Sequence, residues 1–111
     1  PLTESNKKFV NKDLLQQCKK GLILINTARG LLIDDNAVYD SLQSGQLGAY
    51  CTDVLSQEPP TSDHPLLKAP NCYITPHIAW ATVAARKRII KTLVSNINAY
   101  FSGIPQNVVT K

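Results

Sequence analysis

The clearest hydrophobic signal in the chain is an unbroken run of four large apolar residues, 22–25, bounded by Gly21 and Gly30. A short continuous run of this kind predicts a strand buried on both faces, as in a parallel sheet covered by helices. Apolar segments at 49–54 and 72–75 predict two further strands. The three segments are the candidate strands of one sheet.

Helices are predicted between and after these strands. Asn11 is a suitable N-cap for a helix over 12–18, and either Asp34 or Asp35 can cap a helix that Gly45 ends. Thr82 is a suitable N-cap for a long helix over 82–102. Its apolar stripe at helical spacing comprises Ile90, Leu93, Val94, Ile97 and Phe101. The alternation of helices and strands predicts an α/β fold with a parallel sheet.

Composition narrows the class of protein. The chain has 111 residues, 43% of them hydrophobic, which suits one globular domain. The net charge of +4 is modest, and we interpret the basic cluster over 86–91 as the solvated face of a helix rather than a nucleic-acid patch. No apolar run is long enough to span a bilayer. The three cysteines have no metal-like spacing, so we expect no metal and a reduced, cytoplasmic setting.

Each predicted strand is followed by a polar side chain that could do chemistry. These side chains are Arg29, Asp53 and His77, and carboxyl ends of parallel strands meet at one edge of a sheet. Arg29 can bind a carboxylate through two hydrogen bonds, and His77 can exchange a proton near neutral pH. Glu58, in a proline-rich loop over 55–71, could orient the His77 ring.

Plainer interpretations of the same residues stay open on this pattern alone. Arg29 could form a surface ion pair, and His77 could be a packed, hydrogen-bonded core histidine. Glu58 could be a solvated loop carboxylate, and Asp53 could cap the turn that follows it. His64 reads as part of the loop structure.

Taken together, the motifs resemble the D-isomer-specific 2-hydroxyacid dehydrogenase family, in its NAD-binding domain. The matching segments keep the family's order and spacing over nearly the whole chain: 1–3, Lys20-Gly21, 25–30, 32–34, Asp53-Val54, Glu58-Pro59, 63–66, Pro70-Asn71, 74–79 and 103–109. The segment 77–82 is most similar to the glycerate dehydrogenase/hydroxypyruvate reductase branch. The resemblance implies hydride transfer between NAD(H) and a small 2-keto or 2-hydroxy acid.

The resemblance also implies roles for individual residues. Arg29 would hold the substrate carboxylate, His77 would exchange the proton with the substrate oxygen, and Glu58 would orient His77. Asp53 would contact the nicotinamide carboxamide. The residues that would line the cofactor are Thr27, Ala28, Arg29, Asp53, His77 and Ala79.

One family feature is missing from this sequence, the Gly-x-Gly-x-x-Gly phosphate loop with its ribose-reading acid. The resemblance therefore covers only the second half of a doubly wound, Rossmann-type domain, over 1–103, with a tail over 104–111 directed toward a missing substrate domain. We expect the isolated fragment to be inactive, to bind NAD weakly or not at all, and to self-associate, as a homodimer or otherwise. NADP is not excluded. The alternative is an NAD-sensing, dimerising interaction module without turnover.

Overall fold

The computed structural model describes residues 2–109 of the chain. These residues form two compact units that divide between His77 and Ile78. We call residues 2–77 the N-terminal unit and residues 78–109 the C-terminal unit. The sequence-based division at residue 103 stays a prediction, and residues 1, 110 and 111, which belong to its two segments, lie outside the described residues.

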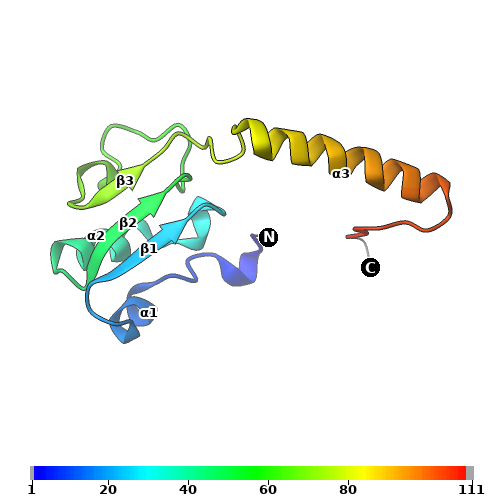
Figure 1. Ribbon diagram of the computed structural model, residues 1–111. Helices are drawn as coiled ribbons and strands as arrows, with labels where there is room; N and C mark the ends of the chain where they lie inside the picture. The colour runs from blue at the N-terminus through cyan, green and yellow to red at the C-terminus, as the bar shows by residue number, and fades with distance from the viewer. Residues whose placement is uncertain (1, 110–111) are drawn as a thin grey trace. The chain divides into compact units, whose positions relative to one another are not determined.

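The N-terminal unit is built around a three-stranded parallel sheet in the order β1-β2-β3 (Figure 1). The strands are β1 (Leu22–Asn26), β2 (Leu47–Thr52) and β3 (Cys72–Ile74). The predicted α/β class, with a parallel sheet and flanking helices, is confirmed. β2 begins two residues earlier than the predicted segment 49–54, and Asp53 follows it rather than ending it.

Local sequence rules place the helices of this unit. α1 (Lys12–Gln17) begins after Asn11, whose side chain accepts a hydrogen bond from the Leu14 amide. α2 (Asp35–Gln43) begins after Asp34, whose side chain accepts from the amides of Asn36 and Ala37. Three short 3₁₀ helices were not predicted: η1 (Glu4–Asn6), η2 (Gly30–Leu32) and η3 (Pro65–Lys68). Their single turns are too short to carry a periodic pattern.

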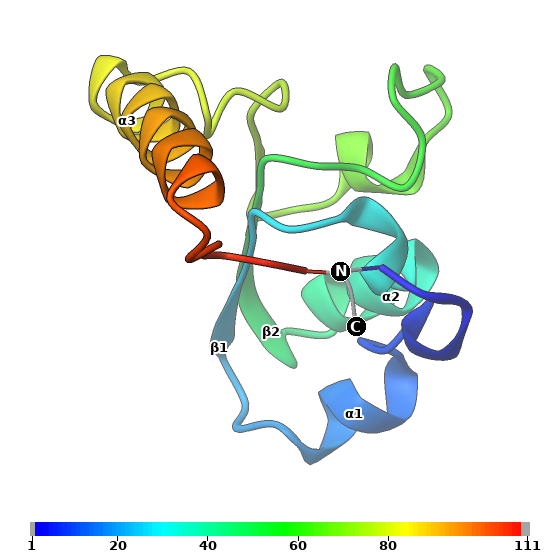
Figure 2. The same ribbon diagram turned by 90° about the vertical axis from the view of Figure 1, so that its right-hand side faces the viewer.

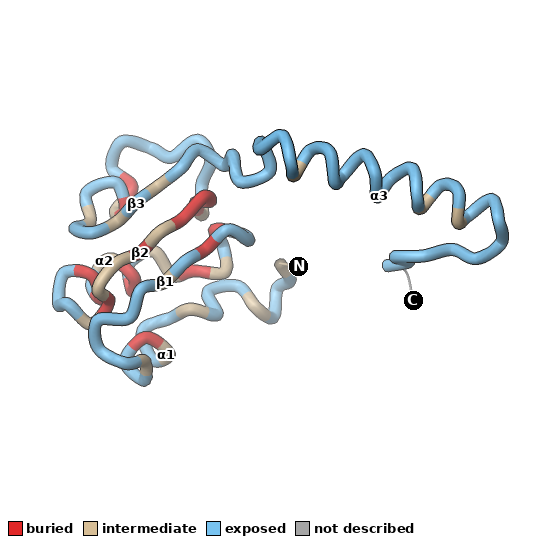
Figure 3. Tube along the Cα trace, viewed as in Figure 1, coloured by how far each residue is buried: buried red, intermediate tan, exposed pale blue. Residues whose placement is uncertain are grey.

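The core lies on one face of the sheet, where α1 and α2 are packed (Figures 2 and 3). Its buried side chains are Leu15, Ile33, Ala37, Val38, Leu42, Leu47, Tyr50, Leu55 and Leu66. Cys72 packs against this cluster, and burial raises the pKa of its thiol to about 11. It therefore behaves as a small hydrophobic residue, as the sequence predicts.

The opposite face of the sheet is bare. Ile25 of β1 is 69% exposed and Tyr73, in the same register row of β3, is 63% exposed. The prediction that β1 is buried on both faces is therefore wrong. No helix of the described N-terminal unit covers this second face, although its residues are as apolar as those that face the core.

The C-terminal unit consists mainly of α3 (Val83–Phe101), which begins after Thr82 and is followed by Ser102 and Gly103. The predicted helix over 82–102 is confirmed. The Thr82 side chain accepts a hydrogen bond from the Ala85 amide, and Gly103 adopts a left-handed conformation with φ of 74°. None of the α3 residues is buried. No helix within residues 2–109 is long and apolar enough to cross a membrane.

Candidate functional site

Arg29 is presented by a turn that the side chain of Asn26 organises. Asn26, the last residue of β1, is buried; its Nδ2 donates to the Arg29 carbonyl at 3.0 Å and its Oδ1 accepts from the Ala28 amide at 3.0 Å. The same Nδ2 lies 3.4 Å from the Tyr50 hydroxyl. The turn leaves Thr27, Ala28 and Arg29 exposed beyond the end of the strand.

Gly30 follows Arg29 because no larger residue fits there. A Cβ on Gly30 would lie 1.9 Å from the carbonyl carbon of Leu55. The turn after β1 therefore packs directly on the backbone of the loop after β2. This close approach brings the Arg29 turn up against the segment that carries Glu58.

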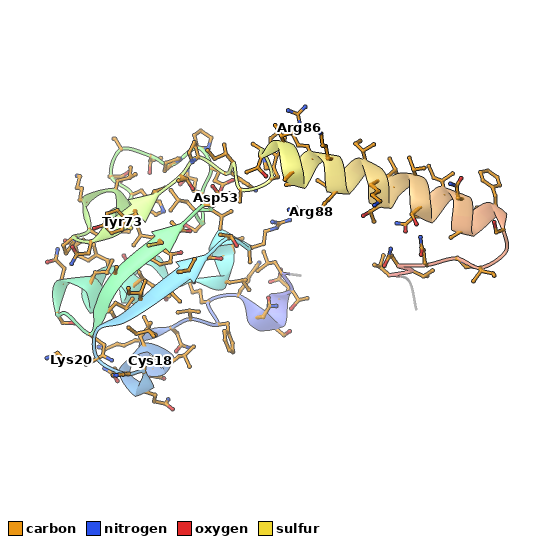
Figure 4. All side chains as sticks on the ribbon, in the orientation of Figure 1. Cys18, Lys20, Asp53, Tyr73, Arg86 and Arg88 are labelled. Carbon is orange, nitrogen blue, oxygen red and sulfur yellow. The ribbon has the colours of Figure 1, made fainter. Side chains whose placement is uncertain are left out.

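Asp53 lies at the carboxyl end of β2, with 5% of its surface exposed (Figure 4). Its amide donates to the Asn26 carbonyl at 3.0 Å, and its Oδ1 accepts from the hydroxyl of Thr75 at 2.5 Å. The carboxylate is thus held between the ends of β2 and β3. Lys20 precedes the start of β1, so its label in Figure 4 shows the end of the sheet that lies opposite Asp53.

Glu58 and His77 form the central pair of the site. Glu58 Oε2 lies 2.7 Å from His77 Nδ1, and Glu58 Oε1 accepts from the Leu55 amide at 2.9 Å. Both carboxylate oxygens are therefore held. The His77 amide donates to the Thr75 carbonyl at 3.0 Å, and His77 adopts a left-handed conformation with φ of 54°, which turns the chain sharply after β3.

The hydrogen bond from His77 is the main cause that lowers the pKa of Glu58 below its ordinary value, and the Leu55 amide lowers it further. Glu58 therefore remains a carboxylate at neutral pH. A carboxylate on Nδ1 fixes the orientation of the imidazole and leaves proton exchange to Nε2. The arrangement is suited to general acid–base chemistry.

Two adjoining clefts connect these residues. The larger has a volume of about 500 Å³, and its lining includes Asp53, Glu58, Thr75 and His77 among mostly apolar side chains. The smaller, of about 170 Å³, has Arg29, Glu58 and His77 in its lining. Glu58 and His77 line both clefts, so the structure brings together a cation, an acid–base pair and a buried carboxylate.

Among the other predicted cofactor residues, Thr27 and Ala28 lie in the Arg29 turn, whereas Ala79 belongs to the C-terminal unit. The roles of all these residues stay predictions. Within the described part of the chain, no group of three or more histidine, cysteine or acidic side chains could hold a metal ion.

Two residues at the ends of the strands support the site, and the sequence does not single them out. Asn26 and Thr75 stand inside recognised segments, but only the structure shows that their side chains hold Arg29 and Asp53. His64 lies in the loop, as predicted, but it is 6% exposed and its ring accepts a hydrogen bond from the Leu66 amide. No periodic pattern signals this burial, because Leu66 is buried whereas Leu67 is 46% exposed.

Known proteins match the segment that carries these site residues, and several match nearly the whole chain. The family described as "D-isomer specific 2-hydroxyacid dehydrogenase, NAD binding domain" matches residues 1–79. A hydroxypyruvate reductase of Blautia hydrogenotrophica is 43% identical over 111 residues, covering 100% of this chain and 34% of that protein. A glycerate dehydrogenase of Methylorubrum extorquens is 42% identical, covering 98% of this chain and 35% of that protein.

A solved structure is similar over nearly the whole chain. An acyclic imino acid reductase in complex with NADPH and D-Arg superposes with a TM-score of 0.83 and 31% identity. The match covers 99% of this chain and 35% of that one. The chain thus spans about a third of the length of the curated relatives it matches.

Proposed function

This chain belongs to the D-isomer specific 2-hydroxyacid dehydrogenases, in their NAD-binding domain, and we propose that it supplies the second half of that domain in an oxidoreductase. The reaction is hydride transfer between NAD(H) and a small 2-keto or 2-hydroxy acid such as hydroxypyruvate and glycerate. The observation that carries the proposal is the Glu58–His77 pair, which shares a cleft with Arg29.

The residues divide the work as follows. Arg29 binds the substrate carboxylate, which fixes the position of C2. His77 donates a proton from Nε2 to the ketone oxygen during reduction and accepts it during oxidation. Glu58 holds Nδ1, so that the ring keeps its orientation and Nε2 is left to face the substrate. The nicotinamide, when bound, supplies the hydride.

The larger cleft fits the nicotinamide end of such a cofactor. Its apolar walls suit a planar ring, and the buried Asp53 carboxylate is an acceptor for a carboxamide N–H. The phosphate loop is absent from this sequence, so the chain by itself holds only this end. We propose NAD as the cofactor, with NADP as an open alternative. The 111-residue chain by itself binds the cofactor weakly or not at all and does not turn over.

The proposal also covers the cellular compartment and the oligomeric state. Three free cysteines favour a reducing, cytoplasmic setting. The bare sheet face and the apolar stripe of α3 favour self-association of the isolated chain, as a homodimer or a larger assembly. Neither a nucleic acid nor a membrane is a proposed partner.

The deciding experiment uses the complete polypeptide that carries this segment and follows NADH oxidation with hydroxypyruvate and glyoxylate. We expect turnover that falls roughly 100- to 10,000-fold in His77→Ala, because the proton donor is lost. Arg29→Lys should chiefly raise KM, because a lysine cannot form the paired hydrogen bonds. The matched control is Lys20→Ala, which removes an exposed cation at the opposite end of β1 and should leave both constants unchanged.

The opposing outcomes are distinct. Absence of turnover with any 2-keto acid, together with retained NADH binding, would favour the sensing module. Full turnover by the monomeric 111-residue chain would refute the proposal that this segment is inactive alone.

A further inference from the structure

A partly buried polar cluster adjoins the smaller cleft, which its member Ser56 lines together with Glu58 and His77, and it takes no part in the mechanism above. It consists of Asp35 at the start of α2, Ser56 in the loop after β2, and His64 just before η3. The Ser56 hydroxyl donates to Asp35 Oδ2, and His64 Nε2 lies 3.4 Å from both Asp35 Oδ2 and Ser56 Oγ. The cluster joins two parts of the 55–71 loop to the first turn of α2.

The hydrogen bonds define which nitrogen of His64 carries the proton. Nδ1 accepts from the Leu66 amide at 3.3 Å, so Nε2 is the donor toward Asp35 and Ser56. A nucleophilic serine would need the carboxylate on Nδ1, opposite the hydroxyl, whereas here both oxygens face Nε2. The cluster is therefore built to hold the backbone rather than to activate Ser56.

The backbone that it holds is that of Leu55 and Ser56. The peptide bond between these two residues packs on Gly30, where a Cβ would lie 2.4 Å from the Ser56 nitrogen. The Leu55 amide, in the preceding peptide bond, donates to Glu58 Oε1 at 2.9 Å. This short stretch of backbone thus packs on the Arg29 turn and also orients Glu58.

We propose that Asp35, Ser56 and His64 are positioning residues for the Glu58–His77 pair. They hold the backbone of Leu55 and Ser56 in place, so that the Leu55 amide keeps Glu58 aimed at His77 Nδ1. The catalytic use of this alignment rests on the proposed function. The alignment itself can be measured without turnover.

The first test is a carboxyl ¹³C NMR titration of Glu58 in the 111-residue chain. The groups that act on Glu58 are His77 and the Leu55 amide, which lower its pKa, and Asp53, whose charge raises it. In Ser56→Ala and His64→Leu we expect the Glu58 midpoint to shift upward, because the Leu55 amide is no longer held. Ser56→Thr and His64→Gln, which keep a donor, should restore the original midpoint.

The matched control is Ser44→Ala. The Ser44 hydroxyl donates to the Ser41 carbonyl at 3.2 Å, at the far end of α2 from Asp35, and its loss should leave the Glu58 midpoint unchanged. An unchanged midpoint in folded Ser56→Ala would overturn the proposal. If His64→Leu does not fold, hydrogen exchange of the Leu55 amide in Ser56→Ala decides the matter: faster exchange supports the proposal, and unchanged exchange overturns it.

Activity separates this proposal from the proposed function. In the complete polypeptide, Ser56→Ala should lower kcat with little change in the KM for the 2-keto acid, because Arg29 is not altered. If the unaltered complete polypeptide shows no turnover, the proposed function fails, while the NMR titration still decides the positioning role. If turnover is present and the Glu58 midpoint does not move in Ser56→Ala, only the positioning role fails.

Discussion

The two units follow the same local rules but differ in what they bury. α2 and α3 both begin at a side-chain N-cap, Asp34 and Thr82, and both are followed by a glycine with positive φ, Gly45 and Gly103. Yet α2 buries four residues and α3 buries none (Figure 3). Capping and periodicity are therefore sufficient to form and end a helix, whereas burial requires a partner surface.

The sheet repeats this contrast within the N-terminal unit. Leu24 faces the core and pairs with Tyr50, which is 1% exposed, while the neighbouring Ile23 is 60% exposed. Both isoleucine and leucine fit the same apolar run. Which of them is buried depends on the side of the sheet on which α1 and α2 pack.

The largest expected effect comes from glycines in the two units. Gly30→Ala places a Cβ 1.9 Å from Leu55 backbone atoms that cannot move freely, so we expect the N-terminal unit to lose more than about 4 kcal/mol or to fail to fold. Gly103→Ala meets no heavy atom within 4 Å and costs about 1–2 kcal/mol of local backbone strain. Urea unfolding followed by circular dichroism measures both. Equal urea midpoints for Gly30→Ala and Gly103→Ala would contradict the difference in packing between the two units.

Leucines test burial directly. Leu42→Ala, at a side chain that is 4% exposed, should destabilise the N-terminal unit by about 2–5 kcal/mol. Leu93→Ala, at a side chain that is 52% exposed, should change stability by less than about 0.5 kcal/mol. A comparable loss in Leu93→Ala would show that the α3 stripe is covered in solution. Sedimentation of both variants would then identify self-association as the cause.

The two N-caps give a smaller effect. Asp34→Ala should cost the N-terminal unit about 1 kcal/mol, and Thr82→Ala should reduce the helicity of α3 without moving the unfolding midpoint of the N-terminal unit. Asp34→Asn keeps the capping oxygen without the charge and is the control. A shift of that midpoint in Thr82→Ala would show that the units are coupled.

The lowered pKa of Asp34 predicts that the stability of the N-terminal unit depends on pH. Burial raises the pKa of Asp34, but hydrogen bonds from the Ala37 and Asn36 amides and the Lys8 ammonium outweigh this, so the net pKa lies below its ordinary value. Its stabilisation is therefore present above the ordinary pKa of an aspartate and is lost as the pH falls through the lowered value. Unfolding midpoints measured down to low pH should fall less steeply in Asp34→Asn than in the unaltered chain.

The smallest expected effect is a shift in the pKa of Glu58 when His77, the last residue of the N-terminal unit, is replaced. His77→Ala should raise the pKa of Glu58 toward its ordinary value, because the hydrogen bond from His77 is the main cause that lowers it. A carboxyl titration by NMR measures this shift, with Lys20→Ala as the control. The stabilisation from Glu58 is present above the ordinary glutamate pKa and is lost as the pH falls, so this loss on acidification should be weaker in His77→Ala. An unmoved Glu58 midpoint would argue against the pair in solution.

Much of the fold could be predicted because its signals are local. Asn11 and Thr82 act at the caps where the sequence places them, Asp34 is the cap of the two aspartates that the sequence offers, and the apolar segments become parallel strands. The 3₁₀ helix at Pro65–Lys68 and the burial of His64 were missed, because neither follows a periodic pattern. The exposure of one face of β1 was not predicted, for another reason. An apolar run shows that a strand can be buried on both faces, but not that another element packs on each of them.

The apolar segments and the polar residues after them predict that Arg29, Asp53 and His77 lie at one edge of a parallel sheet, although each strand ends one or two residues from its predicted limit. The contact of Glu58 with His77 across 19 positions, and the partly buried cluster around Ser56, become visible in the folded chain. The two kinds of feature differ in range. Caps and periodicity act within one or two turns of the chain, whereas the path of a long loop depends on the packing of side chains far apart in sequence.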